Sequence, residues 1–414
     1  MNWQLKMVQV LSNKKSLIKN IFLLFALQFF NYVAPFLILP YLARSFSVVT
    51  FGSYIYYITI AQFLAIFIGL GFDLSAPRRI CKVNSEFLNN YVSVVYCLKL
   101  IALIFSNVVI VIFLLIVGKY ESVMMFSLFI TGLGLTLTPQ WFFSSVQRMG
   151  VVSLAGIATK AMFLCFVYAF IKNDEDLHIL YFLYSVSFLL PGIFCSVYLK
   201  TSYNIKLKIR KNMLVLIFKD TIDFFISRLV VSLYTTSCGL IIGTLKGAYS
   251  LSIYSVSEKL YLAAQSLIYP VTNSLYPYIS QQQNKRFAIL VFYCGVIISC
   301  IGVIAGCFIS RDVLLFVFGE KYLQSNDVLK VFIFTLGVTF PSVILGYPIL
   351  SSFKLSKYTN KSVYYGAVIF FISITYFIIT NTLSPVTMAS CVLLSETIVF
   401  LYRLGVFYTK FIRV

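Results

Sequence analysis

Charged residues are scarce in this chain of 414 residues, where Asp, Glu, Lys and Arg together make up 11% of the sequence. An ordinary soluble domain carries about 25% charged residues. The chain is instead 60% hydrophobic and 17% aromatic, with a mean hydropathy of +0.93. So little charge cannot cover the surface of a soluble multidomain enzyme. The composition therefore predicts a protein that crosses a membrane several times.

Acidic residues are especially few, since 13 Asp and Glu stand against 33 Lys and Arg and leave a net charge of +20. In a soluble protein this excess would indicate nucleic-acid binding. In a membrane protein it matches the bias of cytoplasmic loops toward Lys and Arg. We therefore expect membrane lipids, and not nucleic acid, around this chain.

Residues for catalysis and metal binding are also sparse. The chain has one His and nine Cys, and no two Cys stand at the CxxC spacing. It has no Gly-rich phosphate-binding loop and no nucleophile with a histidine base. We therefore expect neither an enzyme nor a metal or cofactor site, and we interpret the cysteines as small packing residues.

Long apolar runs recur along the chain and lack the alternation that is typical of barrel strands. A helix needs roughly 17–25 mostly apolar residues to cross the hydrocarbon core. The sequence therefore predicts an all-α membrane protein with about twelve transmembrane helices. The predicted spans are 20–43, 51–73, 91–117, 122–146, 150–171, 178–199, 219–243, 249–277, 287–309, 328–350, 363–380 and 385–407.

Lys and Arg are unevenly divided between the loops that join these spans. If the N-terminus is cytoplasmic, the inner loops hold about threefold more Lys and Arg than the outer loops. This bias predicts that both termini face the cytoplasm. The basic segment 200–212 falls near the middle of the chain. It predicts a linker between two lobes of roughly six spans each, residues 1–199 and 213–414.

Several charged residues fall inside the predicted spans, where one charge costs about 2.5–3.5 kcal/mol to insert. Adjacent residues of a helix diverge by about 100°, so we expect Glu258 and Lys259 to face different partners or water. Cations outnumber acids among these deep residues, which predicts a water-filled, positively charged cavity suited to a phosphate or pyrophosphate. The deep cations are Lys99, Lys160, Arg228 and Lys259, and the acids are Glu258, Glu396 and Asp223.

Several stretches, in their order and spacing, are similar to one known family. They resemble the Wzx-type polysaccharide flippases of the MOP superfamily, and the likeness covers essentially the whole chain. Ser47 and Ser252 depart from the pattern, because the family commonly has glycine there. The matching stretches are 28–44, Phe51-Gly52, 71–79, 251–259, 276–280 and 318–322.

The resemblance implies a MOP fold like that of the MATE exporters, in the inner membrane of a bacterium. It implies that the chain moves undecaprenyl-pyrophosphate-linked O-antigen, or similar, repeat units from the cytoplasmic to the periplasmic leaflet by alternating access. A polysaccharide polymerase and a chain-length regulator would be its protein partners.

The resemblance also implies roles for individual residues. The cavity cations of the family fall on Arg228 and Lys259, followed by Lys160, and either Arg78 or Arg79 corresponds to the family's basic residue after the second span; Lys99 joins them by its depth in a predicted span. These cations would bind the diphosphate. The candidates for coupling transport to an ion gradient are Glu258, Glu396, Asp223 and Asp73.

Two other functions stay open at the level of the sequence. A MATE-like, ion-coupled exporter of small molecules would share the architecture, but we would expect acidic residues in its cavity, and the first predicted span has none. A membrane polysaccharide polymerase would be expected to have a large outer loop, which the predicted loops do not provide. A flippase therefore agrees best with the residues.

Overall fold

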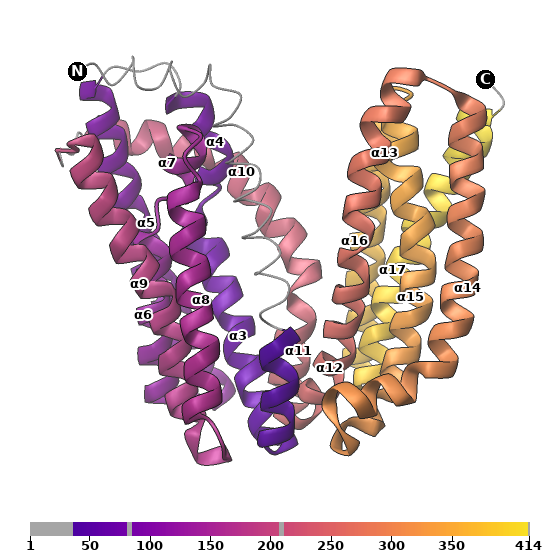
Figure 1. Ribbon diagram of the computed structural model, residues 1–414, viewed down its shortest axis with the longest axis horizontal. Coiled ribbons are helices and arrows are strands. Elements are labelled where there is room, and N and C mark those ends of the chain that lie inside the picture. The colour runs from indigo at the N-terminus through magenta and orange to yellow at the C-terminus, as the bar shows by residue number, and fades with distance from the viewer. Residues whose placement is uncertain (1–35, 81–84, 207–210, 413–414) are drawn as a thin grey trace. The chain divides into compact units, whose positions relative to one another are not determined.

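The structure is a computed structural model that describes residues 36–80, 85–206 and 211–412. Within these ranges every regular element is a helix (Figure 1). Nine segments of the described chain are long and apolar enough to cross a membrane. The predicted all-helical, multi-span membrane fold is therefore confirmed for this part of the chain. The count of twelve spans stays a prediction, since most of the first one, 20–43, lies outside the described residues.

The chain divides into two compact units. Unit 1 comprises Met1–Thr50 and Tyr56–Ser237, and unit 2 comprises Phe51–Ile55 and Cys238–Val414. The helices up to residue 235 are Phe36–Ser45, α3 (Val48–Gly69), α4 (Phe72–Ile80), α5 (Ser85–Val117), α6 (Ser122–Leu137), α7 (Gln140–Ser145), α8 (Gly150–Phe170), η1 (Asp174–Asp176), α9 (Leu177–Tyr203) and α10 (Lys211–Thr235).

The remaining helices belong to unit 2 from Cys238 onward. They are α11 (Ser237–Leu245), α12 (Gly247–Ser266), α13 (Ile268–Gln282), α14 (Lys285–Phe318), η2 (Glu320–Ser325), α15 (Asn326–Ile344), the π-helical η3 (Leu345–Ser351), α16 (Ser356–Ile379), α17 (Pro385–Val406) and η4 (Phe407–Ile412).

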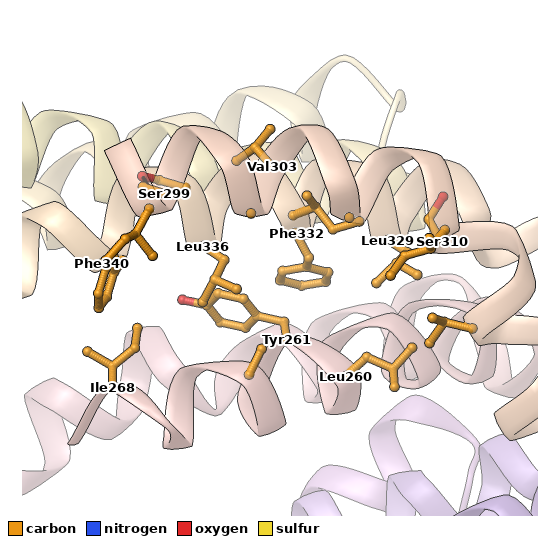
Figure 2. Close-up of a pocket in the computed structure, with 18 residues that line it drawn as sticks. Leu260, Tyr261, Ile268, Ser299, Val303, Ser310, Leu329, Phe332, Leu336 and Phe340 are labelled. Carbon is orange, nitrogen blue, oxygen red and sulfur yellow. Dashed lines mark hydrogen bonds between the residues drawn. The ribbon is translucent and has the colours of Figure 1, made fainter. Parts of the chain in front are cut away.

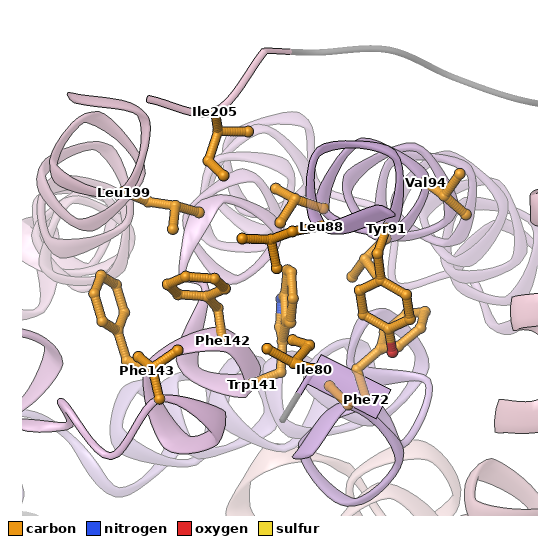
Figure 3. Close-up of a cluster of buried hydrophobic side chains, with 14 of the residues drawn as sticks. Phe72, Ile80, Leu88, Tyr91, Val94, Trp141, Phe142, Phe143, Leu199 and Ile205 are labelled. Atoms are coloured by element: carbon orange, nitrogen blue, oxygen red, sulfur yellow. The ribbon is translucent and has the colours of Figure 1, made fainter. Parts of the chain in front are cut away.

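An aromatic core holds unit 1 together (Figure 3). Trp141, Phe142 and Phe143 of the short helix α7 are fully buried in it, and the ring of Trp141 lies 6.0 Å from that of Tyr91 on α5. Each large aromatic side chain removes about 150–250 Å² from solvent or lipid. The core therefore fixes α7 against α4, α5 and α9, and with it the junction between α6 and α7.

Two glycines let α6 and α9 pack closely. A Cβ atom built on Gly134 would lie 2.4 Å from the carbonyl carbon of Phe188, and one built on Gly192 would lie 2.5 Å from the carbonyl oxygen of Gly134. Neither position can hold a larger residue without moving a backbone. The two helices are therefore held at a separation that only glycine allows.

Two predicted spans are each divided between two helices. The stretch 219–243 contains the end of α10 and most of α11, and 249–277 is divided between α12 and α13. In the second case the cause is Pro270, because proline has no amide hydrogen for the carbonyl of Ser266 and its ring clashes with that carbonyl. The predicted span 249–277 therefore consists of two helices that meet near this proline.

A third break follows α15 in unit 2. Pro341 and Pro348 flank Gly346, whose ψ of −106° is not helical, and the chain continues as a π-helix. Arg403 of α17 is only 8% exposed and reaches this break: its Nη1 donates to the carbonyl of Ser342 at 2.8 Å and its Nε to the hydroxyl of Ser362 at 2.9 Å. The guanidinium thus joins α15, α16 and α17 where the helix bends.

Candidate functional site

Unit 1 contains an open cavity of about 800 Å³, a volume within the range of roughly 300–1,000 Å³ that is typical of ligand sites. It lies among α3, α5, α6, α8 and α9, with contributions from α4, α7 and α10. Its wall includes several polar side chains among apolar ones. These are Asp73, Lys99, Thr138, Gln140, Thr159, Lys160 and Ser187.

Lys99 lies in the wall at the point where α6 ends. Pro139 cannot donate to the carbonyl of Leu135, four residues before it. The Nζ of Lys99 donates to that carbonyl instead, at 2.7 Å, and also to the carbonyl of Thr138 at 3.3 Å. The side chain is 4% exposed. Its ammonium group therefore completes the broken helix as well as bringing positive charge to the cavity.

Lys160 and Asp73 face the same cavity from other helices. Lys160 is half-buried on α8, and Asp73, in the first turn of α4, is close enough to Lys99 to interact with it electrostatically. The structure thus brings together Lys99, Lys160 and Asp73. Two cations and one carboxylate, surrounded by hydroxyl and amide groups, can bind a polar ligand that carries negative charge.

Arg79 is not among the residues that line this cavity. It forms an ion pair with Asp220 of α10, and the pair borders a smaller cavity of about 190 Å³. Phe224 contributes to the walls of both cavities. Both charged groups are substantially exposed, at 53% and 43%, so the pair joins α4 to α10 without being sealed from solvent.

The remaining predicted site residues of α12 and α17 belong to unit 2. Lys259 and Glu258 form a half-buried ion pair on α12, with 3.8 Å between Nζ and Oε2. The expectation that they face different partners is therefore wrong, because the flexible four-carbon stem of lysine can turn back across the angle between neighbouring residues. Glu396 lies half-buried on α17, where it interacts electrostatically with Arg403.

Two predicted residues on α10 have no defined place in the site. The side chain of Arg228 lies outside the described residues, as does that of Arg78. Asp223 is exposed on α10 and does not line the cavity of unit 1.

Sequence reasoning did not single out Gln140, Thr138 or Arg403. The positions of proline in the sequence could have indicated these residues. Pro139 precedes Gln140, and Pro341 and Pro348 lie on either side of the bend that Arg403 reaches. A break in a membrane helix leaves carbonyl groups that a neighbouring polar side chain must satisfy. Within the described ranges, no group of His, Cys, Asp and Glu side chains is arranged to hold a metal ion.

Comparison of the sequence with protein families and curated proteins gives consistent matches. A family model described as polysaccharide biosynthesis protein matches residues 17–283. A candidate O-antigen transporter of Shigella dysenteriae is 26% identical over 75% of this chain and 80% of its own length. The capsular polysaccharide biosynthesis protein CapF of Staphylococcus aureus is 24% identical over 82% of this chain and 86% of its own length.

Solved structures show the same fold at low sequence identity. The lipid II flippase MurJ, in an inward closed conformation, superposes with a TM-score of 0.75 and 15% identity, covering 94% of this chain and 88% of that one. The eukaryotic MATE transporter AtDTX14 superposes with a TM-score of 0.50 and 13% identity, covering 99% and 97% of the two chains.

Proposed function

Because this chain belongs to the polysaccharide biosynthesis protein family and has the fold of its multi-pass transporters, we propose that it moves undecaprenyl-pyrophosphate-linked repeat units of O-antigen, or of a similar surface polysaccharide. The direction of movement is from the cytoplasmic to the periplasmic leaflet of a bacterial inner membrane. The names of the bacterial relatives, which refer to O-antigen transport and capsule synthesis, support this substrate class.

The observation that carries the proposal is the polar cavity of unit 1, which holds Lys99 and Lys160 among membrane-length helices. A diphosphate offers several anionic oxygens, and ammonium groups bind such oxygens as point charges. The hydroxyl and amide groups of the same wall suit sugar hydroxyls. Lys99 and Lys160 are the candidates for direct contact, because both line the cavity.

The wider mechanism that we propose is alternating access by two lobes, residues 1–199 and 213–414, with both termini in the cytoplasm. Arg228, Lys259 and Arg79 would add to the cationic path of the diphosphate. Glu258, Glu396, Asp223 and Asp73 are the candidates for coupling to an ion gradient, and a polymerase and a chain-length regulator would act on the delivered units.

The test uses a bacterial strain whose own copy of the gene is deleted and replaced by the variant to be tested. Replacement of Lys160 by Met is expected to lower surface polysaccharide about ten- to hundredfold, since a hydrogen bond to a charged group contributes about 1.5–3 kcal/mol. Lys172→Met is the matched control, because Lys172 is exposed and outside the cavity. Arg228→Met and Lys259→Met are expected to act in the same direction as Lys160→Met.

Two results would contradict the proposal. Normal surface polysaccharide in the Lys160, Arg228 and Lys259 variants, at equal protein abundance, would exclude a cationic path. A change in resistance to cationic compounds, with surface polysaccharide unaltered by deletion of the gene, would favour the MATE-like exporter instead.

A further inference from the structure

The smaller cavity of unit 1, of about 190 Å³, is formed where α10 packs against α4 and α5. Ser75 and Arg79 of α4 form one part of its wall, and Tyr91 of α5 forms another. The rest is a single face of α10, because the residues there recur at helical spacing. They are Ile217, Asp220, Thr221 and Phe224.

Two contacts hold α10 in this position. A Cβ atom built on Gly71, just before α4, would lie 2.8 Å from the Cβ atom of Phe224, and the φ of Gly71 is +73°. Only glycine therefore lets the two segments approach so closely. The second contact is the ion pair between Arg79 and Asp220. The two contacts of α10 are thus four residues apart, about one helical turn.

Phe224 lies between the smaller cavity and the polar cavity of unit 1. Among the described residues it is the only one that lines both. It is also the only described residue of α10 in the wall of the polar cavity. A change of its χ1 angle to another staggered rotamer would therefore join the two cavities while the backbone of α10 stays in place.

Arg79 gives the smaller cavity a group that can bind a phosphate. A guanidinium binds carboxylates and phosphates through the same planar fork of donors. The side chains of Arg79 and Asp220 are 53% and 43% exposed, so an anion from solvent can reach the pair. Exposed ion pairs contribute little to stability. A diphosphate, which has several anionic oxygens, can therefore replace the carboxylate on the guanidinium at little cost.

The groove of unit 2 lacks such chemistry. It has a volume of about 390 Å³ and lies between the α12–α13 segment, α14 and α15 (Figure 2). Tyr261 and Phe332 form part of its wall, with stacked rings whose centroids are 5.0 Å apart. None of the described residues that line it is charged. An anion meets a cation in each of the two cavities of unit 1, and this groove does not offer one.

We propose that the smaller cavity is an entrance subsite for the diphosphate, and that Phe224 is the gate between this subsite and the polar cavity. The inference rests on the proposed function, which supplies a lipid-linked diphosphate. The anionic oxygens of the diphosphate replace Asp220 on the guanidinium of Arg79. The ring of Phe224 then turns aside, and the diphosphate passes to Lys99 and Lys160 in the polar cavity.

The first experiment measures the binding of inorganic pyrophosphate to the purified full-length chain in nanodiscs by isothermal titration calorimetry. Asp220→Asn removes the carboxylate that competes for Arg79, and is expected to tighten binding by up to about fivefold. Arg79→Gln is expected to weaken binding about tenfold or more, because a charged hydrogen-bond donor is lost. Asp327→Asn is the matched control, since Asp327 also forms an exposed ion pair, with Lys330, and belongs to unit 2.

The second experiment follows the arrival of pyrophosphate in the polar cavity. The chain has two tryptophans, and Trp141 lines the polar cavity but not the smaller one. Trp3→Phe therefore leaves one fluorescent reporter, beside the polar cavity. After rapid mixing with pyrophosphate, we expect the fluorescence of Trp141 to change at a rate that the gate limits.

Phe224→Ala in this background is expected to speed up the fluorescence change about tenfold. The dissociation constant should change less than about twofold, because the substitution removes a barrier and not a binding group. Phe224→Leu should give an intermediate rate, and it carries the test if the alanine variant does not fold. Phe218→Ala is the matched control, since Phe218 is exposed on α10 and lines neither cavity.

Two results would overturn the proposal. If Asp220→Asn binds pyrophosphate no more tightly than Asp327→Asn, the smaller cavity is not an entrance subsite. If the Phe224 variants respond at the same rate as Phe218→Ala, or if the fluorescence of Trp141 does not change, Phe224 is not a gate.

Binding of pyrophosphate does not require transport, so failure of the two proposals can be told apart. Tighter binding in Asp220→Asn, together with normal surface polysaccharide in cells that lack the chain, would contradict the proposed function and leave the anion subsite standing. Loss of polysaccharide in Lys160→Met, with pyrophosphate binding that is insensitive to Arg79→Gln and Asp220→Asn, would contradict only the entrance subsite.

Discussion

Unit 1 and unit 2 each contain a hollow among apolar helices, but the two hollows differ in chemistry. The cavity of unit 1 is about 800 Å³ and is lined by two lysines, a carboxylate and several hydroxyl and amide groups. The groove of unit 2 is about 390 Å³, and aliphatic and aromatic side chains line it. Helices of similar composition therefore build one hollow with a polar, charged wall and one with an apolar wall.

The place of the helix breaks explains this difference. In unit 1, α6 breaks at Pro139 beside the cavity, and Lys99, which satisfies the freed carbonyl, brings a charge into the wall. In unit 2, α15 breaks near Gly346, beyond the part of α15 that lines the groove, and Arg403 is buried at that bend. Both units use a cation from a neighbouring helix to support a break, but Lys99 lines the cavity of unit 1 whereas Arg403 does not line the groove of unit 2.

The largest expected effect comes from filling the polar cavity. Gly69 lines it, and a Cβ atom built there meets no atom within 4 Å. We expect Gly69→Leu to lower surface polysaccharide more than about tenfold, since the leucine would occupy space that the glycan needs, while the protein folds normally. Gly405→Leu is the control, and equal polysaccharide levels in the two variants would contradict the assignment of this cavity.

Removal of the buried cation of unit 2 should cause the largest loss of stability. Arg403→Met leaves the carbonyl of Ser342 without its 2.8 Å bond and removes the link to Ser362. We expect the free energy of unfolding to fall by about 3 kcal/mol, measured by denaturant unfolding in detergent. Arg403→Lys should recover less than half of the loss, because one ammonium group cannot reproduce the geometry of the guanidinium; full recovery would show that charge alone matters.

Lys99 and Lys160 should separate stability from transport within one cavity. Lys99→Met is expected to lower the free energy of unfolding by about 1–3 kcal/mol, since two carbonyl oxygens lose their donor. Lys160→Met is expected to reduce surface polysaccharide about ten- to hundredfold at equal protein abundance. Unfolding and surface polysaccharide are measured for both variants. A loss of stability in Lys160→Met but not in Lys99→Met would exclude a structural role for Lys99.

The smallest effect is expected at the exposed ion pair between α4 and α10. Arg79→Ala should lower the free energy of unfolding by no more than about 1 kcal/mol, because exposed pairs contribute little. The exchanged pair Arg79→Asp with Asp220→Arg should restore stability to the level of the original chain. A transport defect that persists in the exchanged pair would indicate that Arg79 meets the diphosphate itself.

Much of this architecture was predictable from local features of the sequence. The apolar runs around 91–117, 150–171 and 287–309 are helices in the structure, because a backbone in hydrocarbon must satisfy its own hydrogen bonds. The breaks were only partly predictable: proline marks them, but whether a given proline bends, divides or ends a helix depends on the side chains that reach the freed carbonyls. Pro191 lies within the continuous helix α9, whereas α6 ends just before Pro139.

The candidate site was less predictable than the fold. Depth in a predicted span identified Lys99 and Lys160 as expensive charges, and the structure places both in one wall. Depth could not show that Lys99 bonds to α6 or that Lys259 pairs with its own neighbour Glu258. These outcomes depend on side-chain reach of several ångströms, which spacing along a helix does not specify.

The sequence by itself determined that this chain is a multi-span helical membrane protein, because its scarcity of charge and its long apolar runs leave hydrocarbon as the only suitable solvent. Only the tertiary structure decided which buried cations support helix breaks and which line a cavity, and where open space lies beside a glycine. The physical reason is that partners for a buried charge come from residues far apart in the chain, as with Arg403 and Ser342.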